Sequence, residues 1–286
     1  MRRCVAALVV AVALSGCSRS PAPEPPDGDG IANRIVVLAP HLAELAFAAG
    51  AGALVVGVSA YTDFPPEASR LPSVGDAFTV DIERLRLLEP DLVLAWDSGM
   101  PAHTIEGLEQ AGFRVESIQT RSLADIAEAM LRIGELAGRK EEARLEAARF
   151  SDALADLEQD YVSARPVRVF FQVSARPLYT ISGQHFISEL IELCGGTNVF
   201  AGLSELAPAV DVEAVLSRDP EAVIAGSANS DLSVWARFDS LAATRTGNLL
   251  TVDAPHLARA STRLDDAGTR LCAVIDHARQ RLPGPL

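Results

Sequence analysis

The sequence contains few aromatic residues, few cysteines and few basic residues, and these shortages narrow the class of protein. Aromatic side chains make up 5% of the 286 residues, with two tryptophans and three tyrosines, so each of these side chains is worth locating individually. Four cysteines are too few for a small scaffold held together by many disulfides. The 25 Lys and Arg residues are outnumbered by 38 Asp and Glu residues, for a formal charge of −13. This balance excludes binding of nucleic acid through a general positive field.

Hydrophobic residues, in contrast, are plentiful. They make up 49% of the chain and charged residues 22%, a composition that is not that of a disordered protein. The length is sufficient for one large or two medium α/β domains with buried cores.

The N-terminus has the pattern of a secretory signal. Two arginines precede an apolar run at 5–14, which is too short to span a bilayer. The residues at 14–17, Leu-Ser-Gly-Cys, resemble the lipobox of bacterial lipoproteins. We therefore predict a signal peptide at 1–16, a lipid on Cys17 and a flexible Pro- and Gly-rich tether at 17–32, which places the protein in the periplasm, anchored to a membrane. An ordinary signal peptide followed by an incidental cysteine is the alternative.

The remaining cysteines follow from this assignment. Cys4 leaves with the signal and Cys17 carries the lipid, so Cys194 and Cys272 are the only thiols of the folded part. In an oxidising periplasm these two are expected to form a disulfide. Two unrelated buried thiols are the alternative.

Strand and helix patterns alternate along the folded part. Apolar runs typical of strands buried on both faces occur at 34–40, 54–59, 91–96, 114–118, 167–173, 222–225 and 249–252. Helical patterns occur at 41–50, 81–88, 104–112, 123–138, 186–194, 212–217 and 262–280. This alternation predicts an α/β fold with parallel sheets flanked by helices.

One segment in the middle of the chain breaks the alternation. Residues 139–161 contain no Gly or Pro and place apolar residues at helical spacing, which predicts a helix about 35 Å long. We expect two similar lobes, at 33–138 and 166–286, joined by one interlobe helix at 139–165.

A repeat relates the two halves. Asp-Ile-Glu at 81–83 is followed by Glu89-Pro90 and an apolar strand, and Asp-Val-Glu at 211–213 is followed by Asp219-Pro220 and another strand at equal spacing. Generic helix–loop–strand order is the alternative explanation.

The carboxyl ends of the predicted strands point to a cleft. Ligands of open α/β sheets bind beyond these ends. The ends are at Pro40-His41, Trp96-Asp97, Gln172-Val173 and Gly226-Ser227, and we expect them to face each other across an interlobe cleft.

Five segments together carry a family resemblance. They are Leu-Ala-Pro-His with Glu-Leu-Ala-Phe-Ala-Ala-Gly at 38–50, Tyr-Thr-Asp-Phe-Pro-Pro at 61–66, Pro-Asp-Leu-Val-Leu-Ala-Trp at 90–96, Cys-Gly-Gly-Thr-Asn-Val-Phe at 194–200 and Arg-Ala-Ser at 259–261. They resemble the periplasmic vitamin B12-binding proteins of ABC importers, and the resemblance covers 31–279. The surrounding architecture is shared with siderophore and haem receptors.

The resemblance implies two Rossmann-like lobes with cobalamin, or a related corrinoid, in the cleft between them. It implies that the corrinoid packs against Tyr61 and Trp96, that Arg259 contacts the ligand, and that Cys194 pairs with Cys272. A flat, partly apolar macrocycle with amide edges suits aromatic faces and a few hydrogen-bond donors. Ligand contacts are expected from Pro40, His41, Tyr61, Phe78, Trp96, Asp97, Ser98, Gln172, Val173, Pro208, His256, Leu257 and Arg259.

The resemblance also implies a partner and shows departures from the family. The partner is an ABC transporter permease, on which two glutamates dock, one per lobe; they align with Glu83 and Glu192. A solvated surface glutamate is the alternative at each position. Aromatic residues of the family are absent at Ala77 and Ala207, with Phe78 as a substitute for the first, so the pocket is expected to be less aromatic.

The chain lacks the motifs of an enzyme. No nucleophile elbow, phosphate-binding loop or zinc-binding helix motif occurs, and the five histidines have no spacing suited to a metal. His41 is expected to line the pocket as a donor rather than to ligate a metal. We expect a binding protein without enzyme activity, cofactor, metal or nucleic-acid partner, in contact with a membrane only through its lipid anchor. A haem or ferric-siderophore receptor on the same scaffold is the alternative ligand class, and a periplasmic enzyme is an alternative of a different class.

Overall fold

The computed structural model describes residues 30–226 and 231–284. Residues up to Gly30 and residues from Ile31 onward form separate units, and the fold below is that of Ile31–Leu286. The predicted signal peptide at 1–16, the predicted lipidation site Cys17 and nearly all of the predicted tether lie outside the described residues. Ala32, the last residue of the predicted tether, is fully buried, and its N–H donates to the Leu136 carbonyl at 2.7 Å.

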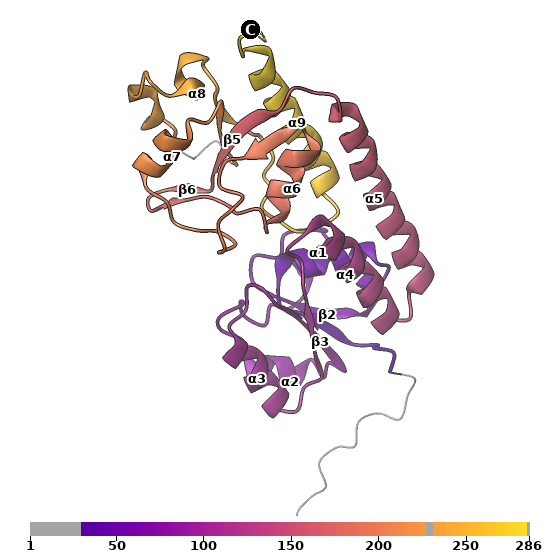
Figure 1. Cartoon of the computed structure of the whole chain (residues 1–286). Helices are drawn as coiled ribbons and strands as arrows, with labels where there is room; N and C mark the ends of the chain where they lie inside the picture. The colour runs from indigo at the N-terminus through magenta and orange to yellow at the C-terminus, as the bar shows by residue number, and fades with distance from the viewer. Residues whose placement is uncertain (1–29, 227–230, 285–286) are drawn as a thin grey trace, which may run out of the picture. The chain divides into compact units, whose positions relative to one another are not determined.

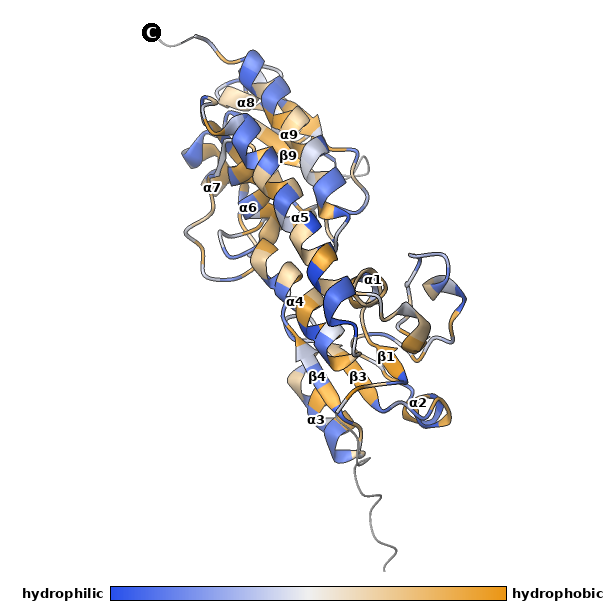
Figure 2. Cartoon of the chain, turned by 90° about the vertical axis from the view of Figure 1, so that its right-hand side faces the viewer, coloured by the Kyte–Doolittle hydropathy of each residue, from blue (hydrophilic) through white to orange (hydrophobic). Residues whose placement is uncertain are grey.

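The first lobe is a parallel four-stranded sheet with the strand order β2-β1-β3-β4. Its strands are β1 (Ile35–Val37), β2 (Val55–Val58), β3 (Leu92–Trp96) and β4 (Val115–Ile118), and its helices are α1 (Pro40–Ala48), α2 (Ile82–Leu87), α3 (Ala102–Gln110) and α4 (Leu123–Leu136). Every residue of β1 and the first four of β3 are buried, as the apolar runs predicted. These two strands are orange in Figure 2, which colours residues by hydropathy.

The second lobe contains a second parallel sheet, with the order β10-β9-β5-β8. Its strands are β5 (Val167–Gln172), β8 (Gly196–Asn198), β9 (Ala222–Ala225) and β10 (Leu249–Thr251), and its helices are α6 (Phe186–Leu193), α7 (Val212–Arg218), α8 (Ala242–Arg245) and α9 (Leu264–Gln280). A small antiparallel pair, β6 (Ser174–Ala175) with β7 (Leu178–Tyr179), follows β5. The sequence patterns did not predict β6, β7, β8 or α8, all of which are four residues or shorter.

The two sheets have the same connectivity. When β5 is matched with β1, the order β8-β5-β9-β10 reproduces β2-β1-β3-β4. The helices before the equivalent strands β3 and β9 begin in the same way. At the start of α2 the Asp81 carboxylate accepts from the backbone N–H of Arg84, and at the start of α7 the Asp211 carboxylate accepts from the backbone N–H of Ala214. Both are N-cap contacts, which satisfy a backbone donor at the helix start. The repeat in the sequence is therefore a repeat of structure.

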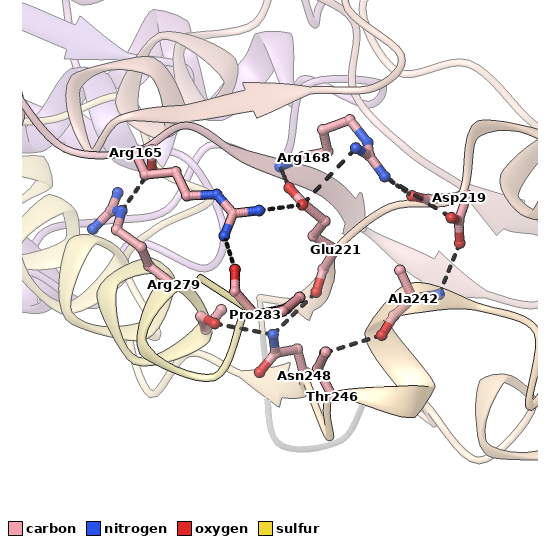
Figure 3. A network of polar contacts seen from close by, with 10 residues as sticks. Arg165, Arg168, Asp219, Glu221, Ala242, Thr246, Asn248, Arg279 and Pro283 are labelled. Atoms are coloured by element: carbon pink, nitrogen blue, oxygen red, sulfur yellow. Dashed lines mark hydrogen bonds and ion pairs between the residues drawn. The ribbon is translucent and has the colours of Figure 1, made fainter. Parts of the chain in front are cut away.

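An acidic residue after each helix completes the repeated unit. Asp91 accepts from the backbone N–H of Arg34 at 3.0 Å in the first lobe, and Glu221 accepts from that of Arg168 at 3.0 Å in the second. Figure 3 shows the second of these groups, in which the Arg168 guanidinium also donates to the Asp219 carbonyl at 2.6 Å. Asp91 thus links the start of β1 to the loop before β3, and Glu221 links the start of β5 to the loop before β9.

The long helix α5 (Lys140–Tyr161) follows the first lobe and precedes the second (Figure 1). It packs against α4 in the first lobe and against α6 and α9 in the second. Its buried face includes Phe150, Leu154 and Leu157, while the side seen in Figure 2 is largely hydrophilic. One cluster of buried apolar side chains runs from α4 through α5 to α6 and α9. The lobes are therefore joined by a shared core as well as by the chain.

The disulfide between Cys194 and Cys272 is present in the structure. It joins the end of α6 to the middle of α9, and both residues are fully buried. Among the described residues, no helix combines the length and the hydropathy that are needed to cross a bilayer.

Candidate functional site

The carboxyl ends of the central strands carry most of the predicted site residues. In the first lobe, two residues separate the end of β1 from Pro40 and His41, which begin α1, and β3 ends at Trp96. In the second lobe, β5 leads into Val173, and the loop after β10 contains Arg259. Side chains from the two lobes meet at this level through charged groups, which define the centre of the site.

A buried glutamate is the hub of these interlobe contacts. Glu44 lies on α1 of the first lobe with its side chain 2% exposed. It accepts hydrogen bonds from Arg263 Nε at 2.9 Å and Arg263 Nη2 at 2.5 Å, and one from Arg259 Nη1 at 3.1 Å. A buried carboxylate is tolerated only when it is paired and hydrogen-bonded, and both arginines come from the second lobe. Glu44 thus links α1 of the first lobe to two arginines of the second lobe.

Arg259 is shared between this hub and the rim. Its guanidinium also donates to both carboxylate oxygens of Asp63, with Nη2–Oδ2 at 3.0 Å. The hydrogen bond from Arg259 holds the pKa of Asp63 below its usual value, and the same contact raises the pKa of Arg259. Because the Asp63 side chain is 65% exposed, this outer pair is accessible to solvent.

Arg263 contacts three side chains. Besides Glu44, its Nη1 lies 2.9 Å from His256 Nε2, and its guanidinium lies 4.2 Å from the centre of the Phe64 ring. The pKa of His256 is lowered, first by burial and then by the positive charge of Arg263. A neutral His256 accepts from Arg263, so the predicted ligand residue His256 has one ring nitrogen already engaged.

A second polar contact between the lobes lies at the start of α4. The backbone N–H of Leu123 donates to Glu189 Oε2 of α6 at 2.8 Å. Burial raises the pKa of Glu189 above its usual value. With α5 and the Glu44 hub, this contact gives the lobes three separate points of attachment.

His41 lies below the surface of the site. It is 6% exposed, its ring centre is 4.9 Å from that of Trp96 in an edge-on contact, and its Nε2 is 3.4 Å from Thr120 Oγ1. Burial lowers its pKa to about 4, so the ring is neutral at pH 7. The predicted donor is therefore nearly covered, and its main contact is with Trp96.

The aromatic side chains predicted to face the ligand differ in exposure. Tyr61 is 82% and Phe78 72% exposed, whereas Trp96 is half-buried. Tyr61 has a φ of 65°, which is unusual for a residue other than glycine and is common at ligand-binding positions. Gly99 is required beside Trp96, because a Cβ there would lie 2.0 Å from the indole ring. The first lobe thus offers two exposed aromatic rings, Tyr61 and Phe78, and the half-buried indole of Trp96 that packs beside Gly99.

Two predicted ligand residues are withdrawn into the protein. Gln172 is fully buried; its Oε1 accepts from Trp235 Nε1 at 2.8 Å and its Nε2 donates to the Asp231 carbonyl at 3.2 Å. Pro208 is buried, and its carbonyl accepts from the Thr180 N–H at 3.1 Å. Both side chains are buried within the second lobe, and their contact with a ligand stays a prediction. The amide oxygen of Gln172 supplies the hydrogen-bond acceptor that the indole N–H of the core residue Trp235 needs.

The remaining predicted residues lie at the surface or in the wall of the second lobe. Asp97 is exposed and pairs with Arg121 at 3.1 Å, and Ser98 beside it is half-buried. Val173 is 47% exposed, whereas Leu257 is 1% exposed and lines a recess in the wall of the second lobe.

The repeat bears on the two glutamates expected to dock, Glu83 and Glu192, whose docking stays a prediction. Glu83 is the second residue of α2, and the side chain is 84% exposed. The equivalent second residue of α7 is Glu213, which is also exposed. Glu192 is exposed but lies on α6, which has no equivalence to α2. Glu213, rather than Glu192, is the structural counterpart of Glu83.

Sequence reasoning missed Glu44, Arg263 and His185. Glu44 carried a signal, since it is a charged residue inside an apolar helix, where a buried partner is required. Arg263 carried none, because its partner Glu44 lies 219 positions away in the chain, whereas the contact of His185 with the Ile187 N–H is local. Among the described residues, no group of three or more His, Cys, Asp or Glu side chains is arranged to hold a metal ion.

Comparison with known proteins gives consistent results. The profile of the periplasmic binding protein family matches residues 35–254. The chain is 34% identical over 252 residues to a vitamin B12-binding protein of Vibrio cholerae, covering 87% of this chain and 91% of that protein. The crystal structure of the periplasmic vitamin B12 binding protein BtuF of Vibrio cholerae superposes with a TM-score of 0.78 and 34% identity, over 87% of this chain and 98% of that one. A periplasmic heme binding protein from Pseudomonas aeruginosa shares the fold, with a TM-score of 0.71 and 24% identity, over 85% and 92% of the two chains.

Proposed function

Because the chain belongs to the periplasmic binding protein family, we propose that it is a receptor that captures vitamin B12 or a related corrinoid and delivers it to an ABC importer. The observation that carries the proposal is the 34% identity to vitamin B12-binding proteins, which extends through both lobes. The relatives with heme in their names are less similar, and their likeness supports the fold alone.

The side chains of the site suit this ligand. A corrin is a flat macrocycle with apolar faces and amide side chains at its edge. Tyr61, Phe78 and Trp96 supply aromatic surface for the faces. We expect Arg259 and Asp97 to hydrogen-bond amide groups, and the pairing of Arg259 with Asp63 leaves little net charge. A neutral site favours an amide-edged ligand over an anionic one.

We propose that binding is the whole of its chemistry. The carboxylates and arginines of the site neutralise one another, as in the Glu44 hub, and the described part of the site offers no activated nucleophile. No cofactor is required for such a role, and the corrinoid is cargo.

We propose that Glu83 and Glu213 are the residues that dock on the permease. They occupy equivalent positions of the two lobes, so they are suited to equivalent basic pockets on a two-fold permease. Anchoring through a lipid on Cys17 rests on the lipobox-like sequence at 14–17, and this anchor is the only membrane contact that we propose.

Titration of the purified protein tests the ligand. Cyanocobalamin and haemin are added separately, and their absorbance and the tryptophan fluorescence are followed. One-to-one binding of cyanocobalamin supports the proposal. Binding of haemin without cyanocobalamin would overturn it.

A further inference from the structure

A recess in the second lobe has no charged side chain among its lining residues. It has a volume of about 220 Å³ and lies at the carboxyl ends of β5 and β9. Its walls include Phe171, Ile181, Ile187 and Leu257, with His185 as the one titratable residue. Ala258 also lines it, and the next residue along the chain, Arg259, turns its guanidinium to Glu44 and Asp63. The recess is thus an uncharged compartment beside a charged one.

His185 presents a fixed hydrogen-bond donor. Its Nδ1 accepts from the backbone N–H of Ile187 at 3.1 Å, as the N-cap of α6. An accepting Nδ1 is unprotonated, so in the neutral ring the proton is on Nε2. Burial keeps the ring neutral, because it lowers the pKa to about 4. The side chain can therefore donate one hydrogen bond and supply no positive charge at pH 7.

This combination suits a primary amide on a short apolar stem. An engineered apolar cavity of about 150 Å³ holds benzene, so the recess has room for a propionamide group and a bound water. His185 donates to the amide carbonyl, and the apolar walls cover the methylene groups. A carboxylate in the same place would lose its hydration without gaining a cation.

On the premise that the protein is a corrinoid receptor, we propose that this recess is an amide-selective subsite. His185 is the residue that determines specificity there: it accepts a macrocycle whose edge carries amides and rejects one whose corresponding side chain is a free carboxylate. The subsite thereby separates corrinoids with complete amidation from partly amidated ones.

The three cyanocobalamin monocarboxylic acids, in which one propionamide is hydrolysed, test the proposal. At pH 7.5 the wild-type protein should bind at least one isomer about tenfold or more weakly than cyanocobalamin. His185→Asn retains an N-cap acceptor but removes the Nε2 donor, and should weaken cyanocobalamin about three- to tenfold. Ala258→Lys adds a cation at the exposed rim and should strengthen binding of the disfavoured isomer, whereas the control Ala258→Gln should not.

The outcomes separate this proposal from the function on which it rests. If the wild-type protein does not bind cyanocobalamin, the corrinoid function fails. If it binds cyanocobalamin and all three acids equally well, or if His185→Asn changes no affinity, the function stands and the amide-selective subsite is overturned.

Discussion

Arg263 of the second lobe donates two hydrogen bonds to the buried carboxylate of Glu44 in the first lobe, 219 positions earlier in the chain. Together with α5 and the contact between Leu123 and Glu189, this pair fixes the lobes at three points. A hinge needs freedom to rotate about one axis, and three separate attachments remove it. We therefore expect little rotation of one lobe against the other.

Substitution of Glu44 tests the hub. Glu44→Gln leaves Arg263 and Arg259 without their buried counter-charge, and we expect the free energy of unfolding to fall by about 3–5 kcal/mol. Asp63→Asn removes the exposed partner of Arg259 and should cost less than about 1 kcal/mol. Urea unfolding of both variants measures the difference, and equal small losses would contradict the role of the buried hub.

Tyr61 offers a test of the aromatic surface. Because its side chain is 82% exposed, Tyr61→Ala should leave the free energy of unfolding within about 0.5 kcal/mol of wild type. Loss of the ring should weaken cyanocobalamin binding by about tenfold. Leu87→Ala on α2, where the side chain is 83% exposed, is the control and should leave the affinity unchanged. Unchanged binding in Tyr61→Ala would remove this residue from the site.

Two histidines make stability depend on pH. The folded state keeps the pKa of His41 and of His185 at about 4, whereas the unfolded chain takes up these protons near 6.5. The unfolded state therefore binds more protons between these values, and the free energy of unfolding falls as the pH falls from 6.5 to about 4. Each residue contributes up to about 1.4 kcal/mol per pH unit.

The contribution of His41 to the pH dependence of stability can be measured separately. His41→Gln should reduce the slope of unfolding free energy against pH in this window, while His103→Gln, at an exposed position of α3, should not. Urea titrations at pH 7.5, 6.0 and 5.0 give the slopes. A slope that is the same in all three proteins would exclude the buried neutral His41.

Docking is tested with matched glutamates. Glu83→Gln and Glu213→Gln should each weaken the complex with the cognate permease in nanodiscs by about tenfold or more, because each removes an interfacial charge. Glu192→Gln is the control. Cyanocobalamin binding should be retained in all three variants. A loss confined to Glu192→Gln would reverse the assignment that the repeat supports.

The disulfide is expected to be a major source of stability. Cys194 and Cys272 close a loop with a sequence separation of 78, and in the chain-entropy account this is worth about 4 kcal/mol. The double substitution Cys194→Ala and Cys272→Ala should lower the free energy of unfolding by about that amount. A loss below 1 kcal/mol would show that the shared core around α6 and α9 suffices.

The sequence predicted which strand ends carry residues of the candidate site, but not which partners those side chains contact. The strand ends at Trp96 and Val173 were predicted from apolar runs, because the length of a buried strand is a local property. The same patterns gave Gln172 a place at a strand end without showing that its amide turns inward to Trp235. The direction of that side chain depends on what packs against the sheet.

The sequence by itself determined the α/β alternation, the long helix at 139–161 and the repeat of Asp81 in Asp211. Each depends on helical or strand periodicity and on caps within a few residues, which neighbouring positions are enough to encode. Only the tertiary structure decided that Glu44 pairs with Arg263 and that Glu213 is the counterpart of Glu83. Those relationships join segments far apart in the chain, and they exist only once packing has set one lobe against the other.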